Sequence, residues 1–332
     1  RDSSTSRGLG DVYKRQILNR VIKWEKFRSV LNQGSRKEDT GKGGRPSYDV
    51  VMMFKILVLQ RLYNLSDDQT EYQINDRMSF MRFLGINLCE KVPDAKTIWK
   101  FKNDIAETET VDKLFCMFDE HLENKGLISH KGTIVDATFV DAPRQRNSRD
   151  ENKKIKNGVI PEEWEKPENK SKLAQKDIDA DWTKKNGERH FGYKDHVKCD
   201  ADSKLITNYS VTSASVHDSQ RCLVFIGQED EVLYADSAYS GKPIALALPE
   251  NCKNQICEKG YRNSPLTSEQ KMNNRRKSRI RCRIEQIFGF MTGAMHGITI
   301  RSIGITRAWM NIGITNLVYN FCRYSYLKRA SA

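Results

Sequence analysis

The stretch GTIVDATFVD, residues 132–141, limits what this chain can fold into more than any other part of it. Its residues alternate as in a β-strand, and both faces carry apolar side chains. A strand of this kind is typical of the centre of a sheet that is covered on both faces. Asp136 lies in its middle, where an unpaired carboxylate is costly or loses its charge. We therefore expect a compensating cation at Asp136, either a divalent metal ion or a Lys or Arg side chain.

The hydrophobic pattern divides the chain near residue 128. Residues 17–128 repeat with a helical period in short segments, which predicts an all-α domain with a helix-turn-helix as one natural arrangement. Residues 129–328 change to the period of strands and predict an α/β domain with a mixed sheet. Within it, a charged insertion at residues 142–189 is longer than an ordinary connection. Residues 1–16 have no apolar period, which predicts a disordered or foreign leader.

The balance of charges indicates what kind of partner to expect. The formal net charge is +13 at pH 7, which favours nucleic acid first and acidic membranes second. The longest apolar run, residues 50–63, contains Lys and Arg and is too short to span a bilayer, so we expect no membrane segment. None of the 8 cysteines stands in a C-x-x-C pair, which favours reduced thiols in a cytosolic protein.

Two further carboxylates stand where the pattern predicts the edge of a crevice. Asp236 ends a short apolar strand and precedes a turn of small residues, and side chains at the carboxyl ends of strands project beyond an open sheet. Its alternative role is a helix N-cap. Glu285 borders the apolar stripe of a long helix at residues 268–295. Its alternative role is a surface ion pair with Arg281, four residues before it.

These three acids can converge at one crevice. Hard carboxylate oxygens suit Mg²⁺ or Mn²⁺, and two such ions are suited to phosphodiester chemistry. The sequence has no P-loop, G-x-S-x-G, H-E-x-x-H or G-x-G-x-x-G motif, so we expect no nucleotide cofactor. The same long helix carries seven cations in thirteen residues with no acid among them, which favours phosphate binding over a solvated charged face. These cations are Lys271, Arg275, Arg276, Lys277, Arg279, Arg281 and Arg283.

At this point the chain resembles a known family, the DDE transposases of bacterial insertion sequences of the insertion-sequence-five type. The resemblance covers roughly residues 40–328, and it rests on the order and spacing of several short motifs. In the helical half these are RPSY from Arg45, RFLGI from Arg82 and VPD from Val92 with Thr97; in the second half they are VDAT from Val135, GYKDH from Gly192, ADSAY from Ala235 and RCRIEQIFG from Arg281.

The resemblance implies an RNase H-like domain with a mixed five-stranded sheet flanked by helices. It implies that Asp136, Asp236 and Glu285 are the catalytic acids and hold two Mg²⁺ or Mn²⁺ ions. The activity implied is cut-and-paste transposition: terminal inverted repeats are bound, a strand is hydrolysed by metal-activated water, and the 3′-hydroxyl attacks target DNA. A homodimer in the synaptic complex and a bacterial, nucleoid-associated location in the cytoplasm are implied as well.

DNA contacts are predicted on both halves of the chain. The residues concerned are Arg275, Arg276, Lys277, Arg279, Arg281, Lys194, Lys96 and Lys100. The family signature has a Tyr and a Lys where this chain has Ser278 and Thr292, so handling of the DNA end on that helix departs from the pattern. Two alternatives stay open: a catalytically inactive DNA-binding repressor on the same scaffold, and a structure-specific nuclease of the same fold.

Overall fold

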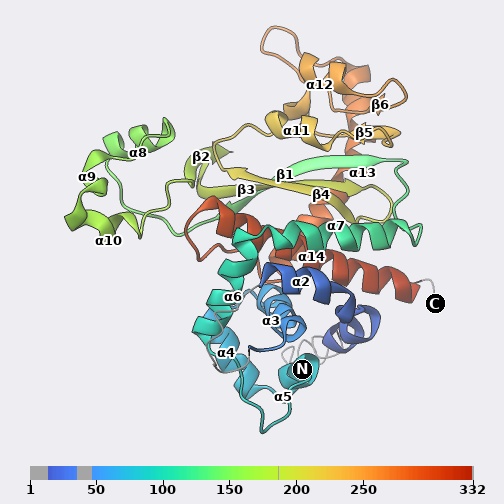
Figure 1. Ribbon diagram of the computed structural model, residues 1–332. Helices are drawn as coiled ribbons and strands as arrows, with labels where there is room; N and C mark the ends of the chain where they lie inside the picture. The colour runs from blue at the N-terminus through green and yellow to red at the C-terminus, as the bar shows by residue number, and fades with distance from the viewer. Residues whose placement is uncertain (1–13, 36–46, 186, 331–332) are drawn as a thin grey trace, which may run out of the picture.

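The computed structural model describes residues 14–35, 47–185 and 187–330 (Figure 1). Most of the expected leader, residues 1–13, lies outside these ranges, and residues 14–21 are helical. The motif at Arg45 lies partly outside them as well. In the described part of the chain, no helix is both long and apolar enough to cross a membrane. All eight cysteines are free thiols.

Short helices make up the first third of the described chain, and polar caps start several of them. Ser66 forms a capping box with Gln69, and Asp94 accepts a hydrogen bond from the Thr97 amide at 2.7 Å. Gly85 ends another helix with φ +80°, a value that favours glycine. The helices are η1 (Trp24–Phe27), α2 (Arg28–Gly34), α3 (Val50–Leu62), α4 (Asp67–Asp76), α5 (Met78–Leu84), α6 (Ala95–Glu107) and α7 (Thr110–Glu123).

A mixed sheet follows, built around the strand at 132–141. The strands are β1 (Thr133–Asp141), β2 (Asp181–Lys185), β3 (Glu188–Asp200), β4 (Ile206–Ser213), β5 (Val232–Tyr234) and β6 (Lys253–Asn254). Along one path their order is β2-β3-β1-β5-β6, and β4 also pairs with β3. β1 is antiparallel to β3 and parallel to β5, so it is central, as the sequence predicted.

The prediction of five strands is wrong by one within the described residues. The sixth strand, β2, comes from the charged insertion and pairs with the first residues of β3, from Glu188 to Gly192. The rest of the insertion forms short helices that project from the body of the molecule (Figure 1). They are α8 (Arg149–Lys156), α9 (Glu162–Glu165), η2 (Pro167–Asn169) and α10 (Lys170–Leu173). They pack around Trp164, which is fully buried, so the insertion has a small core of its own.

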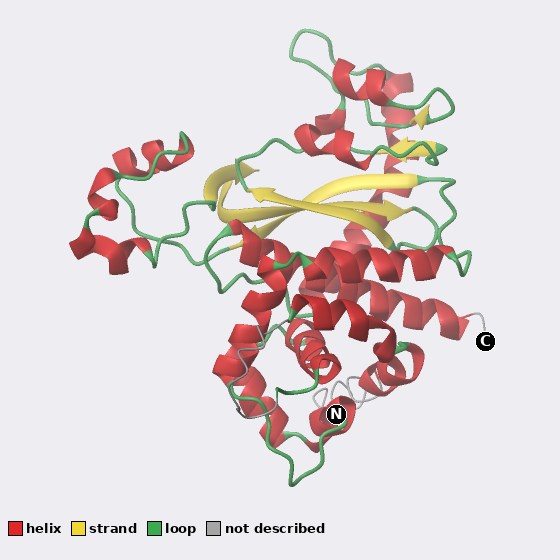
Figure 2. Ribbon diagram, viewed as in Figure 1, coloured by secondary structure: helices red, strands yellow, loops and turns green. Residues whose placement is uncertain are grey.

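Helices cover both faces of the sheet (Figure 2). On one face lie α11 (Ser219–Phe225), η3 (Ser237–Tyr239) and α12 (Lys242–Ala247), which enclose a small apolar cluster that includes Val135 and Leu233. On the other lie α13 (Ser268–Gly293) and α14 (Ile305–Ala330). α14 contacts β4 as well as α3, α6 and α7, so one continuous apolar core joins the helical part to the sheet.

Candidate active site

Asp136 lies at the centre of β1, opposite Val197 of β3. Its side chain is 14% exposed, and both of its oxygens have partners. Oδ1 accepts a hydrogen bond from the Ala137 amide at 2.8 Å, and Oδ2 accepts one from Arg281 at 2.9 Å. Burial raises the pKa of Asp136 to about 6, although the amide and Arg281 both act to lower it. The cation that we expected to compensate the charge of Asp136 is therefore present, and in this structure it is Arg281.

Asp236 follows β5, the parallel neighbour of β1. The last paired residues are Ile134 and Tyr234, and two residues further along each strand direction are Asp136 and Asp236. The charge of Asp236 raises the pKa of Asp136, which agrees with this close placement. Oδ1 of Asp236 also accepts a hydrogen bond at 2.7 Å from the Ala238 amide, in the short turn of helix that follows the strand. Both roles considered for Asp236, a crevice acid and a cap, are compatible with its position.

Glu285 approaches the same place from α13. Its side chain is 56% exposed, and its Oε1 accepts a hydrogen bond from Arg281 at 2.6 Å. Arg281 thus joins an acid on β1 to an acid on α13 through its two terminal nitrogens. Burial acts to lower the pKa of Arg281, but Asp136 and Glu285 outweigh it and the pKa is raised. The predicted pair between Glu285 and Arg281 exists as part of this larger cluster.

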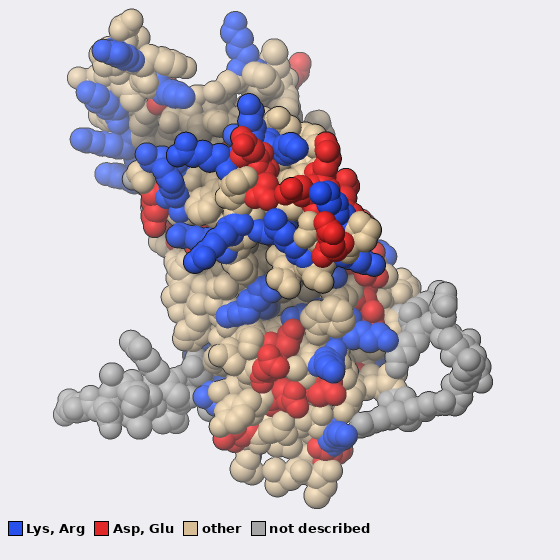
Figure 3. All heavy atoms as spheres, turned by 90° about the vertical axis from the view of Figure 1, so that its left-hand side faces the viewer, with Lys and Arg blue, Asp and Glu red and all other residues tan. Residues whose placement is uncertain are grey.

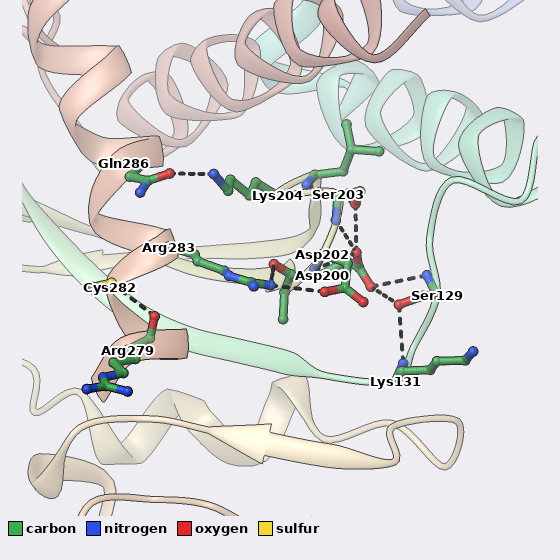
Figure 4. A network of polar contacts seen from close by, with 12 residues as sticks. Ser129, Lys131, Asp200, Asp202, Ser203, Lys204, Arg279, Cys282, Arg283 and Gln286 are labelled. Atoms are coloured by element: carbon green, nitrogen blue, oxygen red, sulfur yellow. Dashed lines mark hydrogen bonds and ion pairs between the residues drawn. The ribbon is translucent and has the colours of Figure 1, made fainter. Parts of the chain in front are cut away.

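The placement of Glu285 depends on how firmly α13 is held. Ile284, Ile287 and Met291 are fully buried, as the predicted apolar stripe requires. Beside that stripe, Arg283 donates to the Ala201 carbonyl at 2.7 Å and pairs with Asp202 at 2.9 Å. These contacts reach the turn between β3 and β4, a turn that Asp200 stabilises through hydrogen bonds from two serine hydroxyls (Figure 4). α13 is therefore fixed to the sheet close to Glu285, by buried apolar side chains and by Arg283.

The donor chemistry of this cluster fits a divalent cation. Asp136, Asp236 and Glu285 offer carboxylate oxygens, the ligands that Mg²⁺ and Mn²⁺ prefer. In the described residues, a different group is close enough to share one ion: ligand atoms of His130, Glu229 and Asp230 lie within 4.8 Å of one another. Asp230 is already bound by Lys198 at 2.8 Å and by Thr133 at 2.6 Å, so that group contains its own cation.

Apart from Arg281, the predicted DNA-contacting cations fall into three settings. Arg275, Arg276 and Arg279 on α13 and Lys96 and Lys100 on α6 reach the surface of the protein. Lys277 donates to the Ile256 carbonyl at 2.9 Å and lies 3.8 Å from Glu258. Lys194 is only 7% exposed and forms an ion pair with Asp218 at 2.8 Å. The first five are therefore exposed to solvent, whereas the charge of Lys194 is balanced by Asp218 inside the protein.

One group of contacts near the end of β1 has no signal in the sequence. His190 stacks on Phe139 with ring centroids 4.4 Å apart, and Lys185 lies over the same ring at 5.6 Å. The charge of Lys185 lowers the pKa of Asp136, so this cation belongs to the surroundings of the acids. These contacts arise because β2 extends the sheet beyond the end of β1. The sequence of the charged insertion has no apolar alternation that would predict β2.

The fold and these acids define a class: an α/β protein with carboxylates gathered at two neighbouring parallel strands and on a helix packed beside them. The chain belongs to the transposase DDE domain family, which matches residues 128–321, more than half of its length. Residues 11–104 match a second family, described as "Transposase domain (DUF772)". The protein is therefore a transposase, and its family implies DNA cleavage and strand transfer in general terms.

Among solved structures, the chain is similar to a piggyBac transposase in a synaptic complex with hairpin DNA. The two share 11% sequence identity with a TM-score of 0.45, and the match covers 95% of this chain and 73% of that chain.

Proposed function

We propose that this transposase binds the terminal inverted repeats of its own element, hydrolyses a DNA strand at each end, and joins the 3′-hydroxyl ends to target DNA. The observation that carries the proposal is that Arg281 joins Asp136 to Glu285, while Asp236 follows the parallel strand next to the one that carries Asp136. The strand order β4-β3-β1-β5-β6, in which β3 alone runs against the other four, supports an RNase H-like domain.

Asp136, Asp236 and Glu285 are the residues that would hold two Mg²⁺ or Mn²⁺ ions. Bound there, the ions supply charge stabilisation for the attacking and leaving oxygens of a phosphodiester. The protein's own part is to orient the acids: amides of Ala137 and Ala238 each fix one oxygen of an aspartate and leave its second oxygen to face a cation. Arg281 balances two of the acids in this structure, and once they are engaged its guanidinium is available for a phosphate.

DNA would lie along the exposed cations on α13 and reach Lys96 and Lys100 on the helical part. On the face from which the insertion projects, Lys and Arg side chains form a broad band across the middle of the molecule, with acids interspersed (Figure 3). A cut-and-paste reaction needs two ends held together, so we propose a homodimer in the synaptic complex. The proposed location is the bacterial cytoplasm, in association with the nucleoid.

A strand-transfer assay with a pre-cleaved end tests the proposal. Asp136→Asn keeps the shape of the side chain and removes its charge, so end binding should persist while joining in Mg²⁺ is lost. Asp141→Asn is the matched control, because Asp141 lies on the same strand with its side chain 70% exposed, and it should join ends normally. Joining by Asp136→Asn would sink the assignment of the acids.

The same assay separates the two alternatives. A repressor on this scaffold would bind ends and neither cut nor join them. A structure-specific nuclease would cut but would not transfer a pre-cleaved 3′-hydroxyl.

A further inference from the structure

Away from the acids, three cations gather where the helical part meets the α/β part. They are Arg61 in the last turn of α3, Lys102 on α6 and Arg301 in the segment before α14. Arg61 is only 7% exposed. Yet across residues 14–35, 47–185 and 187–330 its guanidinium has no hydrogen-bond acceptor and no carboxylate within ion-pair distance. A buried cation of this kind calls for an anion.

The other two cations are held in place beside it. Lys102 binds Asp67 at 2.5 Å, and Arg301 donates to the side chain and the carbonyl of Asn64, both at 3.0 Å. Asp67 is the acid that acts on Arg61, and it is shared with Lys102 and with the amide of Gln60 at 2.7 Å. Asp67 is thus the carboxylate that acts on both Arg61 and Lys102, and its ion pair is with Lys102.

The pKa shifts agree with a close placement of the three cations. Burial and then Arg301 lower the pKa of Arg61 to about 10, and burial, Arg61 and Arg301 all lower the pKa of Lys102. Arg61 remains charged at neutral pH. The C-terminal end of α3 favours a cation there, and the N-terminus of α4, capped by Ser66, adds positive potential from the next helix.

We propose that Arg61, Lys102 and Arg301 form a binding site for a phosphate-type oxyanion, and that a backbone phosphate of bound DNA supplies it. Only the source of the anion rests on the proposed function. A backbone bridge connects this site to the strand that carries Asp136, because Thr299, two residues before Arg301, pairs with Asp141 at the end of β1. α4 and α6 lie on the left-hand side of Figure 1, the face turned to the viewer in Figure 3.

The first test measures binding of one DNA duplex that carries the element's terminal repeat, by fluorescence anisotropy over a range of salt concentrations. Arg61→Gln should weaken binding roughly tenfold at low salt and reduce the slope of log K against log[salt] by about 0.9, the value for one phosphate. Arg61→Lys should recover most of the slope. Arg28→Gln is the control, because it removes a charge from the same helical part where Glu25 and Asp49 already pair with Arg28.

The second test uses inorganic phosphate and no DNA. Phosphate should raise the melting temperature of the wild-type protein above that in chloride at equal ionic strength, and this gain should be smaller in Arg61→Gln than in Arg28→Gln. A gain from phosphate without any change in DNA binding would assign the site to free phosphate and overturn the DNA source. If Arg61→Gln matches Arg28→Gln in both tests, there is no anion site at Arg61.

Failure of the anion site at Arg61 can be told apart from failure of the proposed function. Loss of joining in Asp136→Asn tests the acids with DNA bound, whereas the Arg61 variants are compared by binding alone. Arg61→Lys guards against a folding defect, since it keeps the charge and most of the buried stem.

Discussion

Two aspartates on neighbouring central strands face the same side of the sheet but meet different surroundings. Asp136 of β1 lies under α13, and Asp195 of β3, which pairs with Thr138, lies under α14. Asp136 has Arg281 as a partner, and its pKa is raised to about 6. Asp195 is fully buried with the amide of Asn316 as its partner at 3.1 Å, and burial raises its pKa to about 8.

The difference shows that burial alone does not decide whether an aspartate carries its charge. At neutral pH Asp136 is largely ionised, because a cation and some solvent reach it. Asp195 is largely protonated, which supplies a donor in a region where its Oδ2 and the Asn316 Oδ1 otherwise have no partner in the described chain. α13 therefore covers a cluster of charged side chains, and α14 covers a neutral polar contact within the core.

The strongest test of this comparison replaces each aspartate by asparagine and measures DNA cleavage. Asp136→Asn should lower the rate at least ~1,000-fold, the equivalent of about 4 kcal/mol of lost charge stabilisation. Asp195→Asn replaces a neutral carboxyl by a neutral amide and should leave the rate within about threefold of wild type. Cleavage of terminal-repeat DNA in Mg²⁺ measures both. A large loss in Asp195→Asn, with its fold intact by circular dichroism, would contradict the structural role given to Asp195.

The second effect is on the pH dependence of stability. The pKa of Asp195 is raised on folding, so the native state holds a proton that the unfolded state releases near pH 3.8. Its contribution is complete below that pH and is lost as pH rises towards 8, at up to about 1.4 kcal/mol per pH unit. Asp195→Asn removes this slope.

Urea unfolding of both proteins from about pH 5 to pH 8 gives the measurement, as the difference between wild type and Asp195→Asn at each pH. Other groups titrate on folding, including His196, whose pKa burial lowers to about 4. They act equally in both proteins and cancel in the difference. A difference that stays constant with pH would show that Asp195 is ionised in the core.

A third, smaller effect concerns the cation at Asp136. Arg281 competes with a divalent ion for Asp136 and Glu285, so Arg281→Gln should tighten Mg²⁺ binding about tenfold, or ~1.4 kcal/mol. Calorimetric titration of DNA-free protein measures this without any catalysis. Arg276→Gln is the control, since it removes one exposed charge from the same helix. Equal or weaker Mg²⁺ binding in Arg281→Gln than in Arg276→Gln would mean that Arg281 does not compete for the acids.

The sequence predicted the central strand, the apolar stripe of α13 and the end of β5, because each is a local pattern of period 2 or 3.6. It could not predict β2, since a strand at the edge of a sheet within a charged insertion has no apolar alternation. The sequence also predicted Lys194 as a DNA contact, whereas the side chain is buried. The burial of Lys194 depends on Asp218, which lies 24 residues away in the chain and meets it only in the folded sheet.

The distinction between Asp136 and Asp195 also lay beyond the sequence. Both lie within strands, and no local pattern tells which will meet a cation and which a neutral amide. The difference is made by α13 and α14, helices that begin at Ser268 and Ile305, far along the chain from either strand. Similarly, Arg281 was expected beside Glu285 from helix spacing, but its bond to Asp136 joins residues 145 positions apart.

The smallest expected effect is on stability at Glu285. Its side chain is 56% exposed, and it touches the protein through a pair with Arg281 one helical turn away. Pairs of this kind stabilise a helix by about 0.2–0.5 kcal/mol, so Glu285→Gln should change the free energy of unfolding by no more than that. The same variant should lose DNA cleavage, because in the proposed function the charge of Glu285 helps to hold the metal ions. Urea unfolding and cleavage of one preparation measure the two effects together. A loss of several kcal/mol in stability would show instead that Glu285 holds α13 to the sheet. Glu285 would then be a structural residue like Asp195, and the contrast between the charged cluster and the core would not hold for it.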